Sequence, residues 1–487
     1  MDRLRSSSRL RDAWFAFAGV LLLAFALRAG DLITAVPLHP DEALFSTHAR
    51  RAALGGDWLL HGDLDKPPLT FYAAALSMSA FAAQPVSSVL DFTPQQGVFA
   101  ARLPGLFFSL ITVSAVTALG SRLYGQAGRG LWAGLLFAAS PLAIRYGATA
   151  FTDGLMLCAG ALAALAAARD RWAWAGFWMG AAFCTKYQAV FLFPFIIALG
   201  WGMGTLSLRK CVRLALPFGA WLLALLLWEI LRAQPTSVLE LASAHNAVFR
   251  LIRSDEIAPR LLQWGEHGLR LHGAALAVLL PLAILQGRNQ PLRTRLLDRL
   301  GILYGLLYVA AHWLVAFDDY ERYALSLLLP TCLVLSRGAA ALARISQRSR
   351  RLGTSAALVA GVGVLAVLGG LPPGGSSREA ARHPGVEAAA AALNGKPVAA
   401  ILYDHWLGWE LDFYLGEWTN KRRVYYPTPK SLADGAAQLD EQGPRYFIVP
   451  AEQDVLPWLE ALASRGFVTT FEAQFEQVII FRLDPPP

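Results

Sequence analysis

Charged residues are scarce in this chain of 487 residues: Asp, Glu, Lys and Arg make up 16% of it, whereas 55% is hydrophobic. Soluble domains carry about a quarter charged residues. The charge is missing mainly from stretches of about 18–22 residues, the length that crosses a bilayer as a helix. Because lipid offers the backbone no hydrogen-bond partner, repeated stretches of this kind predict a polytopic α-helical membrane protein.

Cysteine is also rare, and the four cysteines lie in or beside apolar stretches, with neither zinc-motif spacing nor a disulfide framework. We therefore expect buried structural cysteines. They are Cys158, Cys184, Cys211 and Cys332. Histidines in the hydrophilic stretches are possible metal ligands, but we favour polar loop residues without a role. They are His39, His61, His245 and His267.

The net charge of +8 and the pI near 9.4 would suit a nucleic-acid-binding protein, but the distribution of arginine argues against one. The arginines cluster at the ends of apolar stretches, where they set membrane orientation. The first stretch follows a basic start and is not followed by a small-residue cleavage site, so we expect a retained signal anchor.

The apolar stretches predict about eleven spanning helices. Their limits are about 13–30, 97–120, 130–147, 153–168, 172–185, 187–206, 214–231, 270–287, 301–316, 321–337 and 354–371. A further stretch, 69–84, is short and weakly hydrophobic. If it spanned, every later loop would change sides and the rule that basic loops face the cytoplasm would fail. We therefore expect it to lie along, or dip into, the outer leaflet.

This topology places the N-terminus in the cytoplasm and hydrophilic regions of about 31–96, 232–269 and 372–487 outside. We expect a transmembrane domain over 1–371 and, after the Pro- and Gly-rich linker 371–377, a small extracytoplasmic α/β domain over 372–487. Within it, 396–403, 445–450, 467–471 and 477–482 are strand-like, and 431–442 and 452–465 have helical periodicity. It contains no phosphate-binding loop and no dinucleotide-binding fingerprint.

The first outer region contains His39-Pro40-Asp41-Glu42. Adjacent carboxylates just beyond a transmembrane helix could deprotonate an acceptor hydroxyl or bind a metal ion. A structural alternative is a solvated turn in which Asp41 caps a helix over 42–54. Both interpretations fit the sequence alone.

The same region continues with Asp63-Leu64-Asp65-Lys66-Pro67-Pro68. The two prolines restrict the backbone and prevent a helix from running through this point. A lysine held there can bind a phosphate as a point charge. The alternative is an interfacial lysine that reaches towards lipid headgroups.

Further ionisable residues lie at predicted helix ends on the same outer side: Asp153 at a helix start, Lys186 in a tight turn, and Arg322 at another helix start. Charges at a membrane boundary are costly unless they are paired or functional. Each signal is weak by itself, but their convergence on one side predicts a site. The set is Asp41, Glu42, Asp65, Lys66, Asp153, Lys186 and Arg322.

In order along about 10–335, the sequence resembles the GT-C superfamily of membrane glycosyltransferases, in the branch of the protein O-mannosyltransferases and the lipid A aminoarabinose transferase. The motifs that carry the resemblance are Asp41-Glu42, Asp65-Lys66-Pro67-Pro68, Ala101-Arg102-Leu103-Pro104-Gly105, Leu123-Tyr124-Gly125, Ser140-Pro141, Tyr146, Thr152-Asp153-Gly154, Thr185-Lys186 and Arg322-Tyr323.

The resemblance implies an inverting glycosyltransferase that uses a polyprenyl-phosphate sugar donor on the extracytoplasmic face. It implies that Asp41 is the catalytic base accompanied by Glu42, and that Asp153 positions the acceptor or assists the base. Lys66 would bind the donor phosphate, with Lys186 and Arg322 as further phosphate contacts. Asp65 stands where the family often has Glu, so it would bind a metal or orient Lys66.

Two other classes stay open at this point. A transporter or flippase of a lipid-linked sugar would place ionisable groups near the bilayer midplane and show internal repeats, whereas an inactive scaffold would tolerate loss of Asp41 and Lys66. Within the enzyme class, a lipid-pyrophosphate donor is also compatible. The sequence leaves the sugar, the acceptor (lipid, glycan or protein) and a divalent metal ion undecided. Length and compact loops suggest a bacterial inner membrane.

Overall fold

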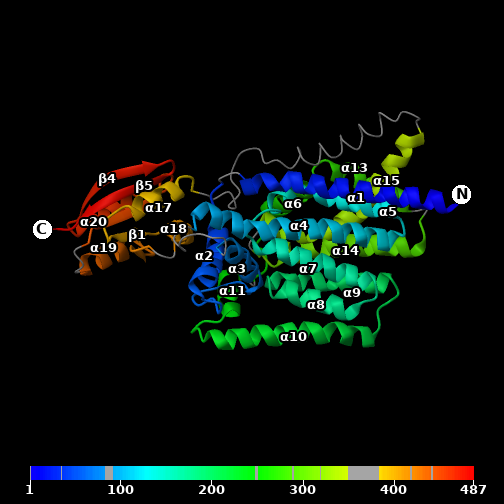
Figure 1. The fold of residues 1–487 in the computed structure, drawn as a ribbon, viewed down its shortest axis with the longest axis horizontal. Coiled ribbons are helices and arrows are strands. Elements are labelled where there is room, and N and C mark those ends of the chain that lie inside the picture. The colour runs from blue at the N-terminus through cyan, green and yellow to red at the C-terminus, as the bar shows by residue number, and fades with distance from the viewer. Residues whose placement is uncertain are drawn as a thin grey trace. The chain divides into compact units, whose positions relative to one another are not determined.

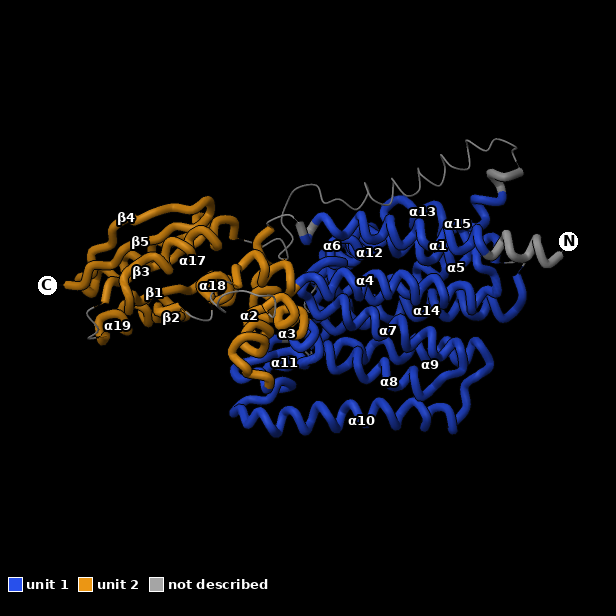
Figure 2. The backbone as a smooth tube through the Cα atoms, viewed as in Figure 1, with its two compact units in different colours: residues 1–33, 59–73, 102–375 blue, residues 34–58, 74–101, 376–487 orange. Residues whose placement is uncertain are grey.

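The computed structural model describes residues 2–33, 36–82, 92–246, 250–287, 290–317, 320–348, 383–416, 419–439 and 443–486. The chain forms two compact units (Figure 2). The helical unit comprises 1–33, 59–73 and 102–375, and the mixed unit comprises 34–58, 74–101 and 376–487. The eleventh predicted helix, 354–371, and the predicted linker, 371–377, lie outside the described residues.

Helices make up the described part of the helical unit, and most of them run roughly side by side (Figure 1). In chain order they are α1 (Asp2–Ile33), the start of α3 (Leu69–Ala82), most of α4 (Pro94–Tyr124), α5 (Ala127–Ala138), α6 (Pro141–Arg145), α7 (Thr152–Ala168), α8 (Trp172–Phe183), η2 (Tyr187–Leu192), α9 (Phe193–Gly202), α10 (Leu208–Arg232), α11 (Val238–Asn246), α12 (Ile257–His272), α13 (Ala275–Gly287), α14 (Leu292–Leu314), η3 (Glu321–Leu327) and α15 (Leu328–Arg348).

Fewer single helices than the eleven predicted spans are long enough by themselves to cross a membrane. Among the described residues, four helices are long and apolar enough to cross a membrane, or five if α12 and α13, which meet at a bend of 83°, count as one. Several predicted spans are broken, and proline explains two of the breaks. The stretch 130–147 divides into α5 and α6 before Pro141, and 187–206 begins as the 3-10 helix η2 before α9, which carries Pro194.

The ambiguous stretch 69–84 forms α3, which has 14 residues. At 1.5 Å per residue its length is about 21 Å, short of the roughly 30 Å hydrocarbon core. A helix of this length does not cross a bilayer unaided, which agrees with the interfacial placement predicted for it.

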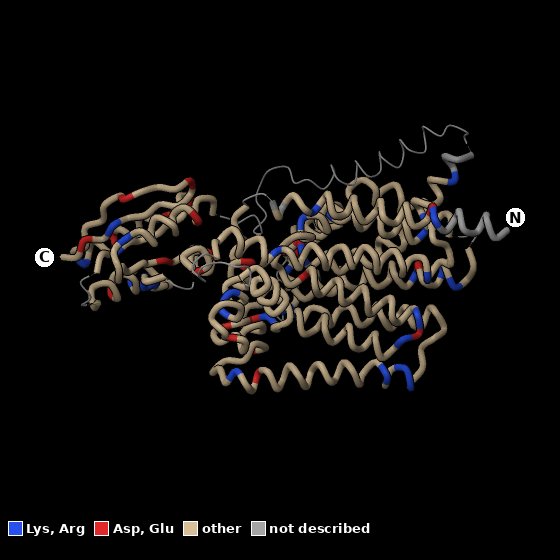
Figure 3. The backbone as a smooth tube through the Cα atoms, in the orientation of Figure 1, with Lys and Arg blue, Asp and Glu red and all other residues tan. Residues whose placement is uncertain are grey.

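Lys and Arg gather towards the two ends of the helical unit, and the middle of its helices carries few charges (Figure 3). Three of the four cysteines follow the prediction, since Cys158, Cys184 and Cys332 are buried, whereas Cys211 is partly exposed. A charge-free middle with charged ends is the distribution expected of helices embedded in lipid.

Small residues allow the helices to approach closely, as is usual where lipid replaces water around a bundle. Gly176 of α8 faces α10 so closely that an added Cβ would overlap the carbonyl oxygen of Leu214. One turn later, Gly180 leaves room for the indole ring of Trp221 on the same helix. The two glycines therefore set the distance between α8 and α10.

The mixed unit contains an α/β domain near the C-terminus, as the sequence predicts. Its sheet has the strand order β2-β1-β3-β5-β4. Strand β1 pairs in parallel with β2 and β3, whereas β5 pairs antiparallel with β3 and β4. The elements are α17 (Val386–Asn394), β1 (Ile401–Asp404), α18 (Gly408–Leu415), β2 (Arg422–Tyr425), α19 (Pro429–Gln438), β3 (Arg445–Pro450), α20 (Leu456–Ser464), β4 (Val468–Phe475) and β5 (Val478–Asp484).

Helix α2 (Pro40–Gly55) also belongs to the mixed unit, and its start differs from the prediction. The N-cap is His39, not Asp41: the imidazole Nδ1 of His39 accepts a hydrogen bond from the backbone N–H of Asp41 at 3.1 Å. Pro40 takes the first helical position, which suits its fixed φ and missing N–H. The predicted helix over 42–54 is otherwise present.

We predict that Gly176→Ala destabilises the helical unit, because the new methyl group forces α8 and α10 apart. Overpacking of this kind costs about 1–3 kcal/mol, so the unfolding temperature of the purified protein in detergent should fall by several degrees. Gly219→Ala in α10 is the control, since an added Cβ there meets nothing within 4 Å. Equal unfolding temperatures for the two variants would contradict this packing account.

Candidate functional site

Lys66 lies in a loop of the helical unit that is fixed at both ends. On the entry side, Arg232 at the end of α10 is 1% exposed and donates hydrogen bonds to the carbonyl oxygens of Leu60 (3.0 Å) and Gly62 (2.6 Å). On the exit side, the N–H of Leu69 donates to the carbonyl oxygen of Cys184 at 3.1 Å. The loop between these anchors presents Lys66.

The neighbouring carboxylate of Asp65 forms an ion pair with Lys66. The imidazole of His245, on α11, also lies 3.3 Å from Asp65. Asp65 thus contacts two groups that carry or can carry positive charge, which supports its predicted role of orienting Lys66. The contacts of Arg232 and His245 were not predicted, because no local motif reveals partners about 170 or more residues away.

The second lysine of the site, Lys186, pairs with Asp153 in a buried position. Lys186 occupies the turn between α8 and η2, and Asp153 lies in the first turn of α7. Their side chains are 6% and 1% exposed, and Lys186 Nζ is 2.7 Å from Asp153 Oδ1. The ammonium group also lies 4.9 Å from the ring centre of Tyr323. Burial strengthens the attraction between the two charges, but removing both charges from water costs free energy.

Burial lowers the pKa of Lys186 to about 8, and the positive charges of Arg322 and Lys66 lower it further, whereas Asp153 opposes the shift. Three cations, Lys66, Lys186 and Arg322, therefore lie within electrostatic reach of one another. Together with the two carboxylates Asp65 and Asp153, they leave an excess of positive charge. An anion bound here would relieve the repulsion among them.

Arg322 follows Glu321 at the start of η3. The guanidinium of Arg322 lies over the rings of Phe151 and Tyr320, at 4.9 and 4.8 Å. Glu321 is 2% exposed and is held by cations from two other helices: Arg145 at 2.7 Å and Arg270. The hydroxyl of Tyr146 donates to it at 3.0 Å. Glu321 thus fixes the start of η3, and with it Arg322 and Tyr323.

A pocket of about 320 Å³ opens beside the two lysines. Asp65, Lys66 and Lys186 form its charged part. Apolar walls come from Val190, Phe191, Leu239 and Phe317. Arg322 and Asp153 are not among its described lining residues, so they act on the lysines rather than on the cavity surface. A charged end with apolar walls is the lining expected for an amphiphile with an anionic head.

The pair Asp41-Glu42 belongs to the mixed unit. Glu42 is fully buried and completes a capping box: its Oε2 accepts a hydrogen bond from the N–H of His39 at 3.1 Å. Asp41 is partly exposed at the second position of α2. Of the two adjacent carboxylates, Glu42 thus has a structural task at the helix start, whereas Asp41 retains access to solvent.

Helix α2 packs against α18 of the same unit. The imidazole of His48 lies 5.1 Å from the indole of Trp409, and the guanidinium of Arg50 lies 4.8 Å from the ring centre of Phe413. Arg50 also donates to the carbonyl oxygens of Phe413 and Asp412. The phenol of Tyr414 accepts from the N–H of Leu38 at 3.1 Å, just before α2. Helix α18 therefore fixes the helix that carries Asp41.

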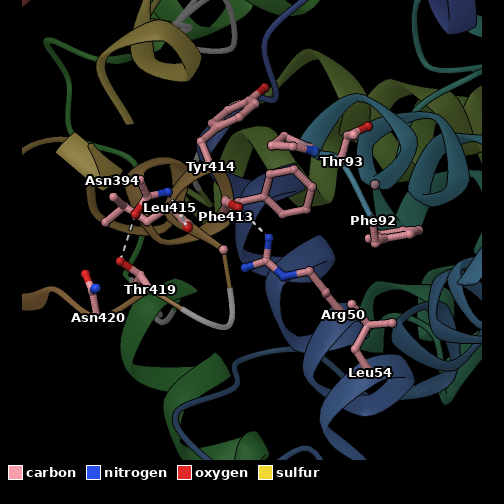
Figure 4. Close-up of a pocket in the computed structure, with 13 residues that line it drawn as sticks. Arg50, Leu54, Phe92, Thr93, Asn394, Phe413, Tyr414, Leu415, Thr419 and Asn420 are labelled. Atoms are coloured by element: carbon pink, nitrogen blue, oxygen red, sulfur yellow. Dashed lines mark hydrogen bonds between the residues drawn. The ribbon is translucent and has the colours of Figure 1, made fainter. Parts of the chain in front are cut away.

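A second pocket of about 320 Å³ adjoins this contact (Figure 4). Arg50 points towards Phe413 across it, and the hydroxyl of Thr419 donates to the side-chain oxygen of Asn394 at 2.9 Å. Its floor includes the buried Phe413 and Leu415. Neither α18 nor this pocket was predicted from the sequence.

Three of the histidines differ from the interpretation as loop residues without a role, and one of them is His245, which lies on α11 and contacts Asp65. His39 caps α2, and His267 is buried in α12 against Trp264, with 5.5 Å between ring centres. Among the described residues, no three His, Cys, Asp or Glu side chains are grouped in a way that could hold a metal ion.

The family model described as dolichyl-phosphate-mannose-protein mannosyltransferase matches residues 65–230. This range begins at Asp65-Lys66 and includes Asp153 and Lys186. No curated protein sequence matches the chain.

Solved structures match over almost the whole chain. ArnT from Cupriavidus metallidurans in the apo state has a TM-score of 0.64 at 14% identity and covers 98% of both chains. The same protein bound to undecaprenyl phosphate has a TM-score of 0.63 at 15% identity, with 96% of this chain and 97% of that chain covered. The oligosaccharyltransferase of Archaeoglobus fulgidus, with Zn and sulfate, has a TM-score of 0.55 at 9% identity, with 95% of this chain and 73% of that one covered.

These matches confirm the GT-C resemblance inferred from the ordered motifs. The chain is an integral membrane protein with the fold of the GT-C glycosyltransferases. Within that fold it resembles the branch that contains protein mannosyltransferases and the aminoarabinose transferase ArnT.

We predict that Trp409→Ala loosens α2, because the indole contacts His48 and lies 5.8 Å from the guanidinium of Arg51. Amide hydrogen exchange within 44–55 should speed up by roughly tenfold or more, since local opening free energies follow lost contacts. Tyr425→Ala, in an exposed position of β2, is the control. Unchanged exchange in α2 of the Trp409 variant would mean that α18 does not support this helix.

Proposed function

We propose that the protein is an inverting glycosyltransferase. It moves a sugar from a polyprenyl-phosphate donor to a hydroxyl group on the extracytoplasmic face of a bacterial inner membrane. The N-terminus is cytoplasmic in this proposal, and the C-terminal α/β domain is periplasmic. The observation that carries the proposal is the pocket with two lysines at one end and apolar walls along the rest.

The donor's chemistry fits this lining. A sugar on a polyprenyl phosphate combines one anionic phosphodiester with a long hydrocarbon chain. Lys66 and Lys186 bind the phosphodiester, while Val190 and Phe191 line the path of the first isoprenoid units. ArnT, whose fold the chain shares, is known with undecaprenyl phosphate bound, and the oligosaccharyltransferase is known with a dolichol-phosphate.

Transfer is a single displacement. The acceptor oxygen forms a bond to the anomeric carbon while the bond from that carbon to the phosphate oxygen breaks, and its electron pair stays on the phosphate. The carrier leaves with one more negative charge than it had in the donor. Fixed cations stabilise the developing charge, and a well-placed group contributes about 3 kcal/mol. Lys66 and Lys186 supply this stabilisation, and attack from the opposite face inverts the anomeric centre.

The proton of the acceptor hydroxyl passes to Asp41, the partly exposed carboxylate at the start of α2. General base catalysis of this kind contributes about 100–10,000-fold. Glu42 supports Asp41 by closing the capping box rather than by taking the proton itself. Asp153 holds Lys186 as an ion pair, a narrower role than the acceptor positioning that the resemblance implied.

The acceptor is a lipid, glycan or protein hydroxyl. A donor with a pyrophosphate link is the alternative within the same class, in view of the likeness to an oligosaccharyltransferase fold. A divalent ion bound by Asp41, Glu42 or Asp65 stays a prediction. It is tested by measuring transfer after EDTA treatment and after adding back Mg²⁺, Mn²⁺ or Zn²⁺.

The decisive variants are Asp41→Asn and Lys66→Ala. Asp41→Asn should lower the rate of transfer by about 100-fold or more without weakening donor binding. Lys66→Ala should lower kcat/KM for the donor by roughly 10–100-fold, because a charge-assisted contact worth about 1.5–3 kcal/mol is lost. Both are measured by transfer from a synthetic polyprenyl-phosphate sugar to a membrane extract.

Asp63→Asn is the matched control, since Asp63 is an exposed carboxylate of the same loop with no proposed role. Near-normal transfer by both the Asp41 and the Lys66 variants would overturn the site assignment. A flippase or scaffold would show no transfer by the wild-type protein either.

The lowered pKa of Lys186 predicts a pH dependence. A lysine with a pKa of about 8 is charged below that pH and neutral above it, whereas the donor phosphodiester keeps its charge. Donor kcat/KM should therefore fall by about fivefold between pH 8 and pH 9. In Lys186→Arg the guanidinium stays charged, so this alkaline fall should disappear. The same fall in both proteins would show that another group titrates.

A further inference from the structure

A third pocket, of about 270 Å³, lies between α13, α14 and α15, on residues that the proposed transfer does not use. Arg295 and Arg299 of α14 line it, together with Ile284 of α13 and Val334 of α15. The two arginines are four residues apart, so they lie on one face of the helix. They are near the first turn of α14, which begins at Leu292.

Asp298 also lines this pocket, but its charge is already balanced. It forms an ion pair with Arg337 of α15, which is 3% exposed. The hydroxyl of Tyr124 also donates to Asp298 at 2.9 Å. Counting Arg337, which pairs with Asp298 but is not among the lining residues, three arginines accompany one aspartate, which leaves an excess of two positive charges. The pocket therefore attracts an anion despite its carboxylate.

Two of these guanidinium groups have hydrogen-bonding capacity left over. Within the described part of the chain, Arg295 Nε and Arg337 Nη2 are buried and have no hydrogen-bond partner. A buried N–H without a partner costs about 1–3 kcal/mol. A phosphate oxygen accepts several N–H bonds at once and matches the planar guanidinium.

The helix face that carries the arginines becomes apolar along α14. Ile302 follows Arg295 and Arg299 at seven and three residues and also lines the pocket, and Leu306 continues the stripe as an exposed residue. On the facing helix α13, Ile284 is 56% exposed. A charged end followed by exposed apolar side chains suits a molecule with a phosphate head and a hydrocarbon tail.

We propose that this pocket binds the phosphate head of an anionic membrane phospholipid, whose acyl chain lies along Ile302 and Leu306. The site is separate from the donor pocket, and the inference holds whether or not the transfer reaction is correct. Arginines that only cluster at a membrane surface would contact any lipid headgroup, and such contacts would not saturate. Binding to the proposed pocket should instead saturate and depend on the headgroup.

The test uses the full-length protein in a neutral detergent, titrated with phosphatidylglycerol while its unfolding temperature is followed. Ligands that bind only the folded state raise this temperature in a saturable way. We expect a rise of roughly 3–5 °C. Phosphatidylcholine and inorganic phosphate, titrated in parallel, separate the charged lipid from a neutral lipid and from a free anion.

Arg295→Gln/Arg299→Gln should raise the lipid concentration for half the effect by about tenfold or more. Arg299→Gln alone, at an exposed position, should shift it several-fold in the same direction without threatening the fold. The matched control is Arg209→Gln/Arg213→Gln, which removes two exposed arginines with the same spacing from α10, where they line none of the described pockets.

A larger shift for the pocket variants than for the α10 control would support the site. Equal midpoints for wild type, pocket variants and control would overturn it. Equal stabilisation by phosphatidylcholine would show that the phosphate charge is not recognised, and equal stabilisation by inorganic phosphate would show that the tail is not. Either result would also overturn the proposal.

Discussion

The buried ion pair between Lys186 and Asp153 is the constraint on which the candidate site depends. Both groups lie in helix ends or turns and are almost without exposure, and Lys66 and Arg322 add positive charge nearby. An ammonium group held in such a place is costly unless something compensates it. The surrounding contacts hold the charges in position: Arg232 anchors the loop before Lys66, and Glu321 fixes the start of η3 before Arg322. A bound phosphate would complete the compensation, which is why we assign the donor to this pocket.

Much of this arrangement could be predicted because it depends on local sequence. The absence of charge over long stretches predicts a helical membrane protein. The prolines after Lys66 predict a fixed loop. The ordered motifs predicted a GT-C fold, which the chain shares with the solved structures. In the C-terminal domain, strand-like stretches located β3 and β5, and helical periodicity located α19 and α20. The pairing of Lys186 with Asp153 was suggested only by their common side of the membrane.

The remainder depends on contacts between distant segments, which a single sequence does not reveal. Arg232 is about 170 residues from the loop it anchors, and α18 supports α2 across more than 350 residues. Short elements such as β2 and α18 carry too few residues for periodicity to be clear. The hydrophobic pattern also did not predict the breaks that divide several of the expected spans. Hydrophobicity reports the composition of a segment and not whether its helix is continuous. His39 was overlooked as the N-cap because histidine is an unusual residue in that position.

Lipid mass spectrometry of cells can show whether a polyprenyl-phosphate sugar is the donor. Extracts of cells that lack the gene are compared with extracts of cells complemented by the wild-type gene. We expect one polyprenyl-phosphate sugar to accumulate in the deleted strain and to return to its normal level on complementation. The mass of that lipid would identify the sugar. An unchanged profile of polyprenyl-phosphate sugars, measured in a strain without a second enzyme of this fold, would mean that the donor is a different molecule.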